Sequence, residues 1–174
     1  MALSLYTISI PLFQQYLQAL AAILDKAEAH AAAKKIDTAV LCATRLFPDM
    51  FALSRQVQIA CDFAKNTAAR LAGSEPPKFE DVEKTLPELK ARIEKTLAYL
   101  ATQDSKGIDS MSGREIVFPI GPNKMKMVAE FYAMHFALPN FFFHLTAAYA
   151  ILRHCGIDIG KRDFMGNVPG LVPV

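Results

Sequence analysis

The chain has 174 residues, of which 52% are apolar and 21% are charged, and its formal net charge is +2. This length and balance suit one globular domain, residues 1–174, with a sizeable core, and they argue against intrinsic disorder. Lys and Arg are spread along the sequence without a basic stripe between aromatic residues, which argues against a nucleic-acid partner.

The N-terminal residues have no positively charged region and are interrupted by Pro11, so the sequence predicts no signal peptide. The most apolar stretch, Phe136 to Leu152, contains Pro139, Asn140 and His144 and is therefore a poor membrane span. Three cysteines lie far apart without a CxxC pair: Cys42, Cys61 and Cys155. We therefore expect a cytoplasmic protein with reduced, buried thiols and no membrane association.

The first half of the chain predicts two long helices with a shorter one between them. Apolar residues recur every three or four positions from about Pro11 to about Ala33, and proline is favourable at the first helical position. Asp37 is expected to cap one or two further turns, through Leu46. The second long helix is expected to begin at Asp49, after a proline, and to stop at Gly73.

The second half predicts a loop, a third helix and an irregular connection. Residues 74–84 are rich in Pro and Glu and favour a loop. The sequence Thr85-Leu86-Pro87-Glu88 is typical of a capping box at the start of a helix. Residues 102–126 are expected to be non-helical, and the β-prone Glu115–Phe118 followed by a Gly-Pro-Asn turn predicts a small hairpin or an extended crossover.

The last helical region is expected to start near Met127. Pro139 should break it into a short helix and a long one, because proline removes a helical hydrogen bond. The long piece should end at Cys155, before Gly156. Four helices with a long third connection predict an all-α four-helix bundle with a small extended or hairpin segment between helices three and four.

Two long stretches point to a known family. LFPDMFALSRQVQIACDFAKNTAARLAG (46–73) and LPNFFFHLTAAYAILRHCGIDIGKRDFMG (138–166) resemble a bacterial domain-of-unknown-function family within the DinB/YfiT-like superfamily of proposed metalloenzymes. The opening SLYTISIPLFQQYLQALAAILDKAEAHA is similar to the start of the same family. The resemblance covers nearly the whole chain and implies an up-down-down-up bundle that is often dimeric, so we expect a homodimer.

The resemblance also implies a divalent metal held by three histidines, one on helix two and two in an HxxxH pair on helix four. In this chain His144 matches the second histidine of the pair, Asn140 stands at the first, and the helix-two position falls near Gln58 or, one turn later, Asp62. Amides are weak ligands for zinc or nickel. The alternative interpretation is a buried polar network in which the amides satisfy the imidazole.

Other residues suggest a pocket and a clasp. We expect His135, Phe141 and Tyr149 to line an aromatic cavity beside His144. The run Gly160–Phe164 combines two cations, a carboxylate and a phenylalanine. Either it binds an anionic ligand at the mouth of the bundle, or it ties the C-terminal segment to another helix; we favour the structural clasp.

Two functions follow from this pattern. The first is binding of a small molecule in an aromatic-lined cavity, with His144 as the polar anchor and a degenerate metal site. The alternative is a divalent-metal-dependent hydrolase or thiol-dependent transferase using His144 with Asn140 and Gln58 or Asp62, in which the metal would lower the pKa of bound water or thiol. The sequence identifies neither a substrate nor a definite catalytic residue.

Overall fold

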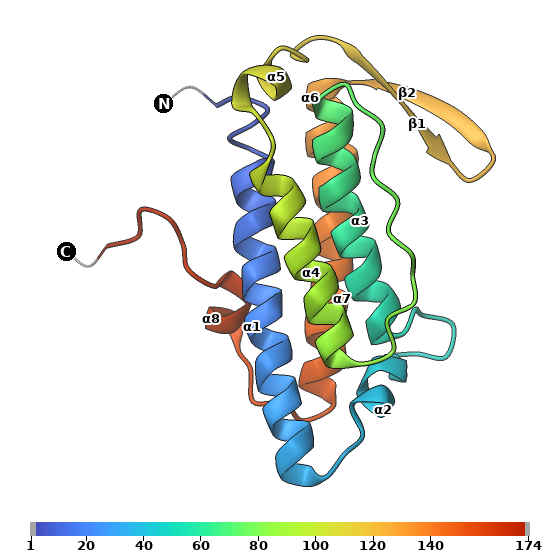
Figure 1. The fold of residues 1–174 in the computed structure, drawn as a ribbon, viewed down its shortest axis with the longest axis vertical. Helices are drawn as coiled ribbons and strands as arrows, with labels where there is room; N and C mark the ends of the chain where they lie inside the picture. Colours follow the sequence, from blue (N-terminus) through green and yellow to red (C-terminus); the bar gives the residue numbers. More distant parts are fainter. Residues whose placement is uncertain (1–2, 173–174) are drawn as a thin grey trace.

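The computed structural model describes residues 3–172, which are mostly helical with one two-stranded hairpin, as the sequence predicts. Figure 1 shows the long helices side by side, with α3 against both α7 and α4, and with α1 against α4. Their bounds are α1 (Ile10–Lys34), α3 (Leu53–Leu71), α4 (Leu86–Ala101) and α7 (Leu138–His154). No helix within the described range is long and apolar enough to span a bilayer.

The shared core consists of the apolar stripes of these four helices. The largest fully buried side chains come from α1, α3, α4, strand β1 (Glu115–Ile120) and the helical residues 129–154, which end in α7. They include Phe13, Leu53, Leu86, Phe118, Tyr132 and Phe141. Helices packed on a common core in this way position side chains rigidly, because interiors are as dense as organic crystals.

The helix predicted over Pro11–Ala33 is confirmed as α1, and Asp37 caps a short helix, α2 (Thr38–Ala43), by accepting from the Ala39 amide at 2.9 Å. The predicted start of the next helix at Asp49 is wrong, because α3 begins at Leu53. The Leu53 amide donates to the carbonyl of Thr44 at 2.9 Å, which closes a loop over the intervening residues. Asp49 therefore lies in a turn.

The capping box at the start of α4 is confirmed: the Glu88 amide donates to Thr85 Oγ1, and the Thr85 amide donates to the Glu88 carboxylate. The expectation of no helix over 102–126 is wrong at α5 (Ser105–Asp109), where Asp104 accepts from the Gly107 amide at 2.8 Å. A cap of this kind satisfies one of the free amides at the start of a short helix.

The hairpin follows α5 and is confirmed. Strand β1 (Glu115–Ile120) pairs antiparallel with β2 (Asn123–Val128), and Figure 1 shows the hairpin projecting beside the end of α3. The strand alternates, so that Ile116 and Phe118 are buried while Val117 is exposed. One face of the hairpin therefore covers the end of the helical core.

The helix break predicted at Pro139 takes another form. The short α6 (Ala129–Phe131) passes into a π-helical segment, η1 (Tyr132–Ala137), which continues into α7 without interruption. The wider π turn accommodates the missing amide hydrogen and the ring of Pro139, which lies at the second position of α7. The arm therefore stays continuous where the proline predicts two separate helices.

The C-terminal segment is clasped to the bundle, as favoured from the sequence. It contains α8 (Lys161–Met165), and Lys26 Nζ on α1 lies 2.6 Å from the Asp163 carboxylate. The ring of Phe164 packs edge-on against Tyr16 and Tyr149, with centroid distances of 5.6 and 5.7 Å. These contacts place the run Gly160–Phe164 in a structural role.

Candidate functional site

The side chain of His144 is held by an amide from α3. Its Nδ1 lies 2.7 Å from Gln56 Oε1, and His144 is 8% exposed. Since an amide oxygen only accepts, Nδ1 donates in this arrangement and Nε2 carries the lone pair. Phe63 stacks on the imidazole at 6.1 Å between centroids, and Phe143 meets it edge-on at 5.2 Å. The histidine therefore sits in an aromatic setting with one polar partner.

Burial lowers the pKa of His144, and the positive charge of Arg55 lowers that pKa further. Both effects favour the neutral imidazole in the folded protein. Gln56, which the sequence reasoning passed over in favour of Gln58, also donates to the Phe51 carbonyl at 3.3 Å. Gln56 lies four residues before Ala60 and eight before Ala64, on the buried face of α3, and this spacing was the sequence feature that could have indicated it.

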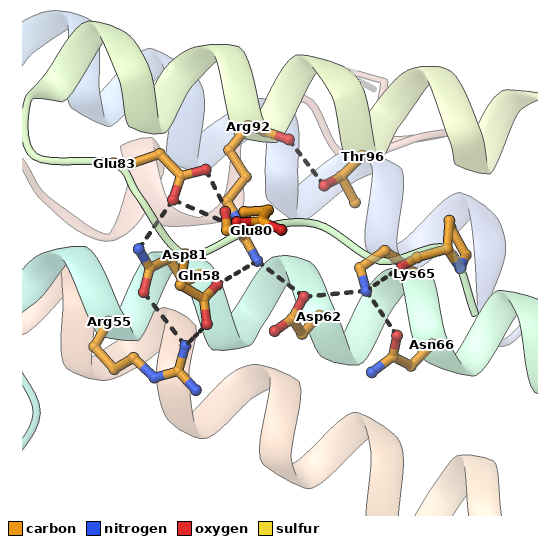
Figure 2. Close-up of polar contacts among 11 residues, drawn as sticks. Arg55, Gln58, Asp62, Lys65, Asn66, Glu80, Asp81, Glu83, Arg92 and Thr96 are labelled. Carbon is orange, nitrogen blue, oxygen red and sulfur yellow. Dashed lines mark hydrogen bonds and ion pairs between the residues drawn. The ribbon is translucent and has the colours of Figure 1, made fainter.

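The other three residues of the predicted metal site are directed elsewhere. Asn140 donates to the Phe136 carbonyl of its own helical arm at 2.7 Å. Gln58 donates to Glu83 at 2.9 Å and accepts from Arg55 at 3.3 Å. Asp62 accepts from a buried arginine on α4, as Figure 2 shows.

This donor set does not fit a divalent metal. His144 supplies one imidazole, while the Gln58 amide and the Asp62 carboxylate are committed to charged partners on other elements. Within residues 3–172, no three His, Cys, Asp or Glu side chains lie together as a metal-binding group. Zinc and nickel sites are built from imidazole, thiolate or carboxylate ligands that converge on one point.

The residues expected to line an aromatic cavity lie in three different environments. His135 is exposed and stacks on Phe131 at 5.4 Å between centroids. Phe141 is fully buried and packs edge-on against Phe13 at 4.9 Å. Tyr149 is half-buried against Phe164, where the surrounding side chains leave no volume for a water molecule.

A buried arginine that the sequence reasoning missed organises the face between α3 and α4. Arg92 Nη2 lies 2.9 Å from both Asp62 and Asp81, and its Nη1 lies 3.1 Å from Glu83 and 3.0 Å from the Glu80 carbonyl. Figure 2 shows these groups converging from α3, α4 and the loop between them. The sequence feature that could have indicated a buried arginine is the position of Arg92 between Leu89 and Thr96, on the face of α4 that is buried.

The same network fixes the connecting loop, residues 72–85, along the side of α3 (Figure 1). Lys65 is 4% exposed and donates to the Pro77 carbonyl at 2.9 Å. The ring of Phe79 lies 4.1 Å from Lys95 Nζ and 5.0 Å from Lys65 Nζ, which are cation–π distances. The loop is therefore a fixed wall.

An open cleft of about 860 Å³ lies between this wall, the C-terminal half of α3 and strand β1. Polar and apolar groups share its lining, which includes Asp62, Lys65, Arg70, Pro76, Pro77, Phe79, Met111, Ile116, Val117, Phe118 and Lys124. This volume is within the range of small-molecule sites.

A second cleft of about 590 Å³ lies near the N-terminal end of α3, beside residues 81–84 of the loop. Its arginines are committed to protein partners, because Arg55 pairs with Asp81 and Arg45 donates to the Met50 carbonyl. The first cleft is therefore the stronger candidate for a ligand site.

Comparisons with known proteins agree with this fold. The family model described as "Domain of unknown function (DUF1993)" matches residues 5–165. A crystal structure of a DinB family member from Shewanella denitrificans is similar over 97% of this chain and 96% of that one, with 42% identity and a TM-score of 0.90. No curated protein matches the chain. By its sequence and its fold, the chain belongs to the DUF1993 family.

Proposed function

We propose that this protein binds a small amphipathic molecule in the cleft between α3, β1 and the α3–α4 loop. The observation that carries the proposal is the cleft itself, whose volume is about 860 Å³ and whose walls combine apolar side chains with the polar ends of Lys65 and Arg70. Ligand sites typically pair a mostly apolar wall with a few fixed polar groups.

The walls of the cleft are fixed by contacts on each side. Arg92 and Lys65 hold the loop, and the buried Phe118 holds β1 against the helical core. A preformed site costs less conformational entropy on binding than a mobile one. Because the His144 environment is packed and its expected metal ligands face other partners, binding at the cleft replaces binding at His144 in this proposal.

The proposal is tested by screening a fragment library with ligand-observed NMR on the wild type and on two variants. Val117 is exposed and lines the cleft, so Val117→Trp should block binding without disturbing the core. Val82 has a similar exposure and lines the second cleft, so Val82→Trp is the matched control. Fragments lost only in Val117→Trp support the proposal, and fragments unaffected by Val117→Trp contradict it.

We also propose that the protein forms a homodimer, as the family resemblance implies. Phe131, Met134 and Phe143 are exposed on the arm formed by α6, η1 and α7. Exposed apolar side chains mark a protein interface when they gather into one patch, which is what the proposed dimer requires of these three residues. Light scattering after size exclusion should give twice the chain mass of 19.2 kDa, and a lower mass for Phe143→Ser. A wild-type mass of one chain would contradict the dimer.

A further inference from the structure

Arg70 occupies a distinctive place in the cleft. It lies in the last turn of α3, and its Nη1 donates to Tyr132 Oη at 2.8 Å. The guanidinium carbon lies 5.7 Å from the ring centroid of Phe118 and 5.8 Å from that of Tyr132. Both aromatic side chains are buried, so the position of the guanidinium group is fixed by parts of the core.

Within the described part of the chain, Arg70 lacks the counter-ions that accompany the two buried cations of this region, Lys65 and Arg92. Lys65 lies 3.2 Å from Asp62, and Arg92 contacts three carboxylates. Arg70 forms no salt bridge with any residue from 3 to 172, and only one of its five N–H groups has a protein acceptor in that range. Its remaining donors are free to bind a ligand.

A structural role alone accounts for part of this arrangement. A cation in the last turn of a helix is stabilised by the partial negative charge of the helix end. The helix end would stabilise a mobile, solvated arginine equally well. It therefore does not explain why the guanidinium group is held by the Tyr132 hydroxyl and by the Phe118 ring. The arrangement resembles a preorganised anion-binding group, because a fixed guanidinium fork matches the geometry of a carboxylate.

The charged residues at the rim of the cleft do not by themselves favour anionic over neutral ligands. Its exposed charged residues are of both signs: Glu75, Lys78, Glu80, Glu115 and Lys124. Glu115 is also neutralised by Lys126 at 2.8 Å. Discrimination between anionic and neutral ligands therefore depends on Arg70, at the inner side of the cleft.

Resting on the proposed function, we propose that the cleft selects organic carboxylates: the carboxylate pairs with Arg70, and the apolar body of the ligand lies against Pro76, Met111 and Val117. The ligand is divided in this way because Arg70 belongs to α3, whereas Pro76 belongs to the α3–α4 loop, Met111 to the turn before β1, and Val117 to β1. A ligand of this class is small, bears one negative charge and carries an aliphatic or aromatic body.

The test compares acids with alcohols of the same carbon skeleton: hexanoate with hexanol, phenylpropionate with phenylpropanol, and indoleacetate with indoleethanol. Dissociation constants are measured by protein-observed NMR. The wild type should bind at least one acid about tenfold or more tightly than its alcohol, as expected for charge-assisted hydrogen bonds. Arg70→Gln should reduce that preference to about one, with binding of the alcohol retained.

Two further variants separate a specific contact from general electrostatics. Lys124→Gln removes a positive charge from the exposed rim of the same cleft and should leave the preference nearly unchanged. Tyr132→Phe keeps the charge of Arg70 but removes its hydrogen-bond acceptor, so the preference should fall without disappearing. A purely structural role for Arg70 would leave the ratio of acid to alcohol affinity the same in every folded variant.

The outcomes distinguish the two proposals. Alcohols that bind the wild-type cleft as tightly as their acids overturn the selection of carboxylates and leave small-molecule binding intact. If no member of either set binds in the cleft, both proposals are overturned. If Lys124→Gln abolishes the preference for acids over alcohols and Arg70→Gln leaves it unchanged, the assignment of the carboxylate contact to Arg70 is overturned.

Discussion

Replacing Arg92 by methionine tests how the wall of the cleft is held in place. The Arg92 side chain is 1% exposed, and its partner carboxylates are exposed by 26% for Asp62, 39% for Asp81 and 12% for Glu83. After the substitution Asp62 keeps Lys65 and Asp81 keeps Arg55. The main loss is therefore at Glu83, which becomes a mostly buried carboxylate without its cation.

The size of the effect follows from these exposures. Removing one partner of a fully buried ion pair costs roughly 3–5 kcal/mol, and two of the three carboxylates here are partly solvated and retain another cation. The Glu80 carbonyl also loses its donor, which costs about 1 kcal/mol. We therefore expect Arg92→Met to lower the free energy of unfolding by about 3 kcal/mol.

Urea unfolding at pH 7, followed by circular dichroism, measures this change. The matched control is Arg55→Met, which breaks an ion pair whose side chains are 40% and 39% exposed and should cost less than about 1 kcal/mol. Adding Glu83→Gln to Arg92→Met should recover part of the loss, because the unpaired charge is removed. An Arg92→Met cost no larger than that of Arg55→Met would refute this account of the network.

Three further predictions concern other parts of the chain. Because the pKa of His144 is lowered, its contribution to stability is fully present above the unfolded pKa of about 6.5 and is lost as the pH falls below that value, with a slope of up to about 1.4 kcal/mol per pH unit. The free energy of unfolding, measured with urea at pH 7, 6 and 5, should therefore fall less for His144→Gln than for the wild type. Cys155 is half-buried while the other two thiols are buried with raised pKa values, so a disulfide reagent should label one thiol quickly in the native protein, and Cys155→Ser should remove that fast phase. A Cβ atom on Gly166, where φ is 60°, would lie 2.9 Å from Ala19 Cβ, so Gly166→Ala should lower the free energy of unfolding by about 1–3 kcal/mol in the same assay, and unchanged stability would show that the clasp adjusts freely.

Much of the fold could be predicted because the signals are local. The capping box of α4 involves residues three apart, and the hairpin follows from β-prone residues on either side of a turn. The start of α3 was missed because it depends on a hydrogen bond from Leu53 to Thr44, across a loop with its own turn signals. The π segment was missed because a proline at position 139 predicts a break between two helices, whereas the structure accommodates Pro139 at the start of α7 within a continuous helical arm.

The candidate site was harder to predict, since it depends on contacts between elements distant in sequence. The sequence placed the α3 partner of His144 at Gln58, two residues after its actual partner, Gln56. On a helix, a shift of two residues turns the side chain to the opposite face. Gln56 consequently faces His144, while Gln58 faces Glu83. Arg70 gave no sequence signal, because its significance comes from Tyr132 and Phe118, which are far from it along the chain.

The most direct test of ligand binding in the cleft is a ¹H–¹⁵N NMR titration of the wild-type protein with phenylpropionate. The account predicts saturable shifts of the amides around the cleft, at Arg70, Gly73 and residues 116–118, with the side-chain Nε–H of Arg70 among them. Amides near His144 and in the second cleft should be unaffected. Shifts centred on His144 and Gln56, with the cleft unchanged, would contradict the central claim.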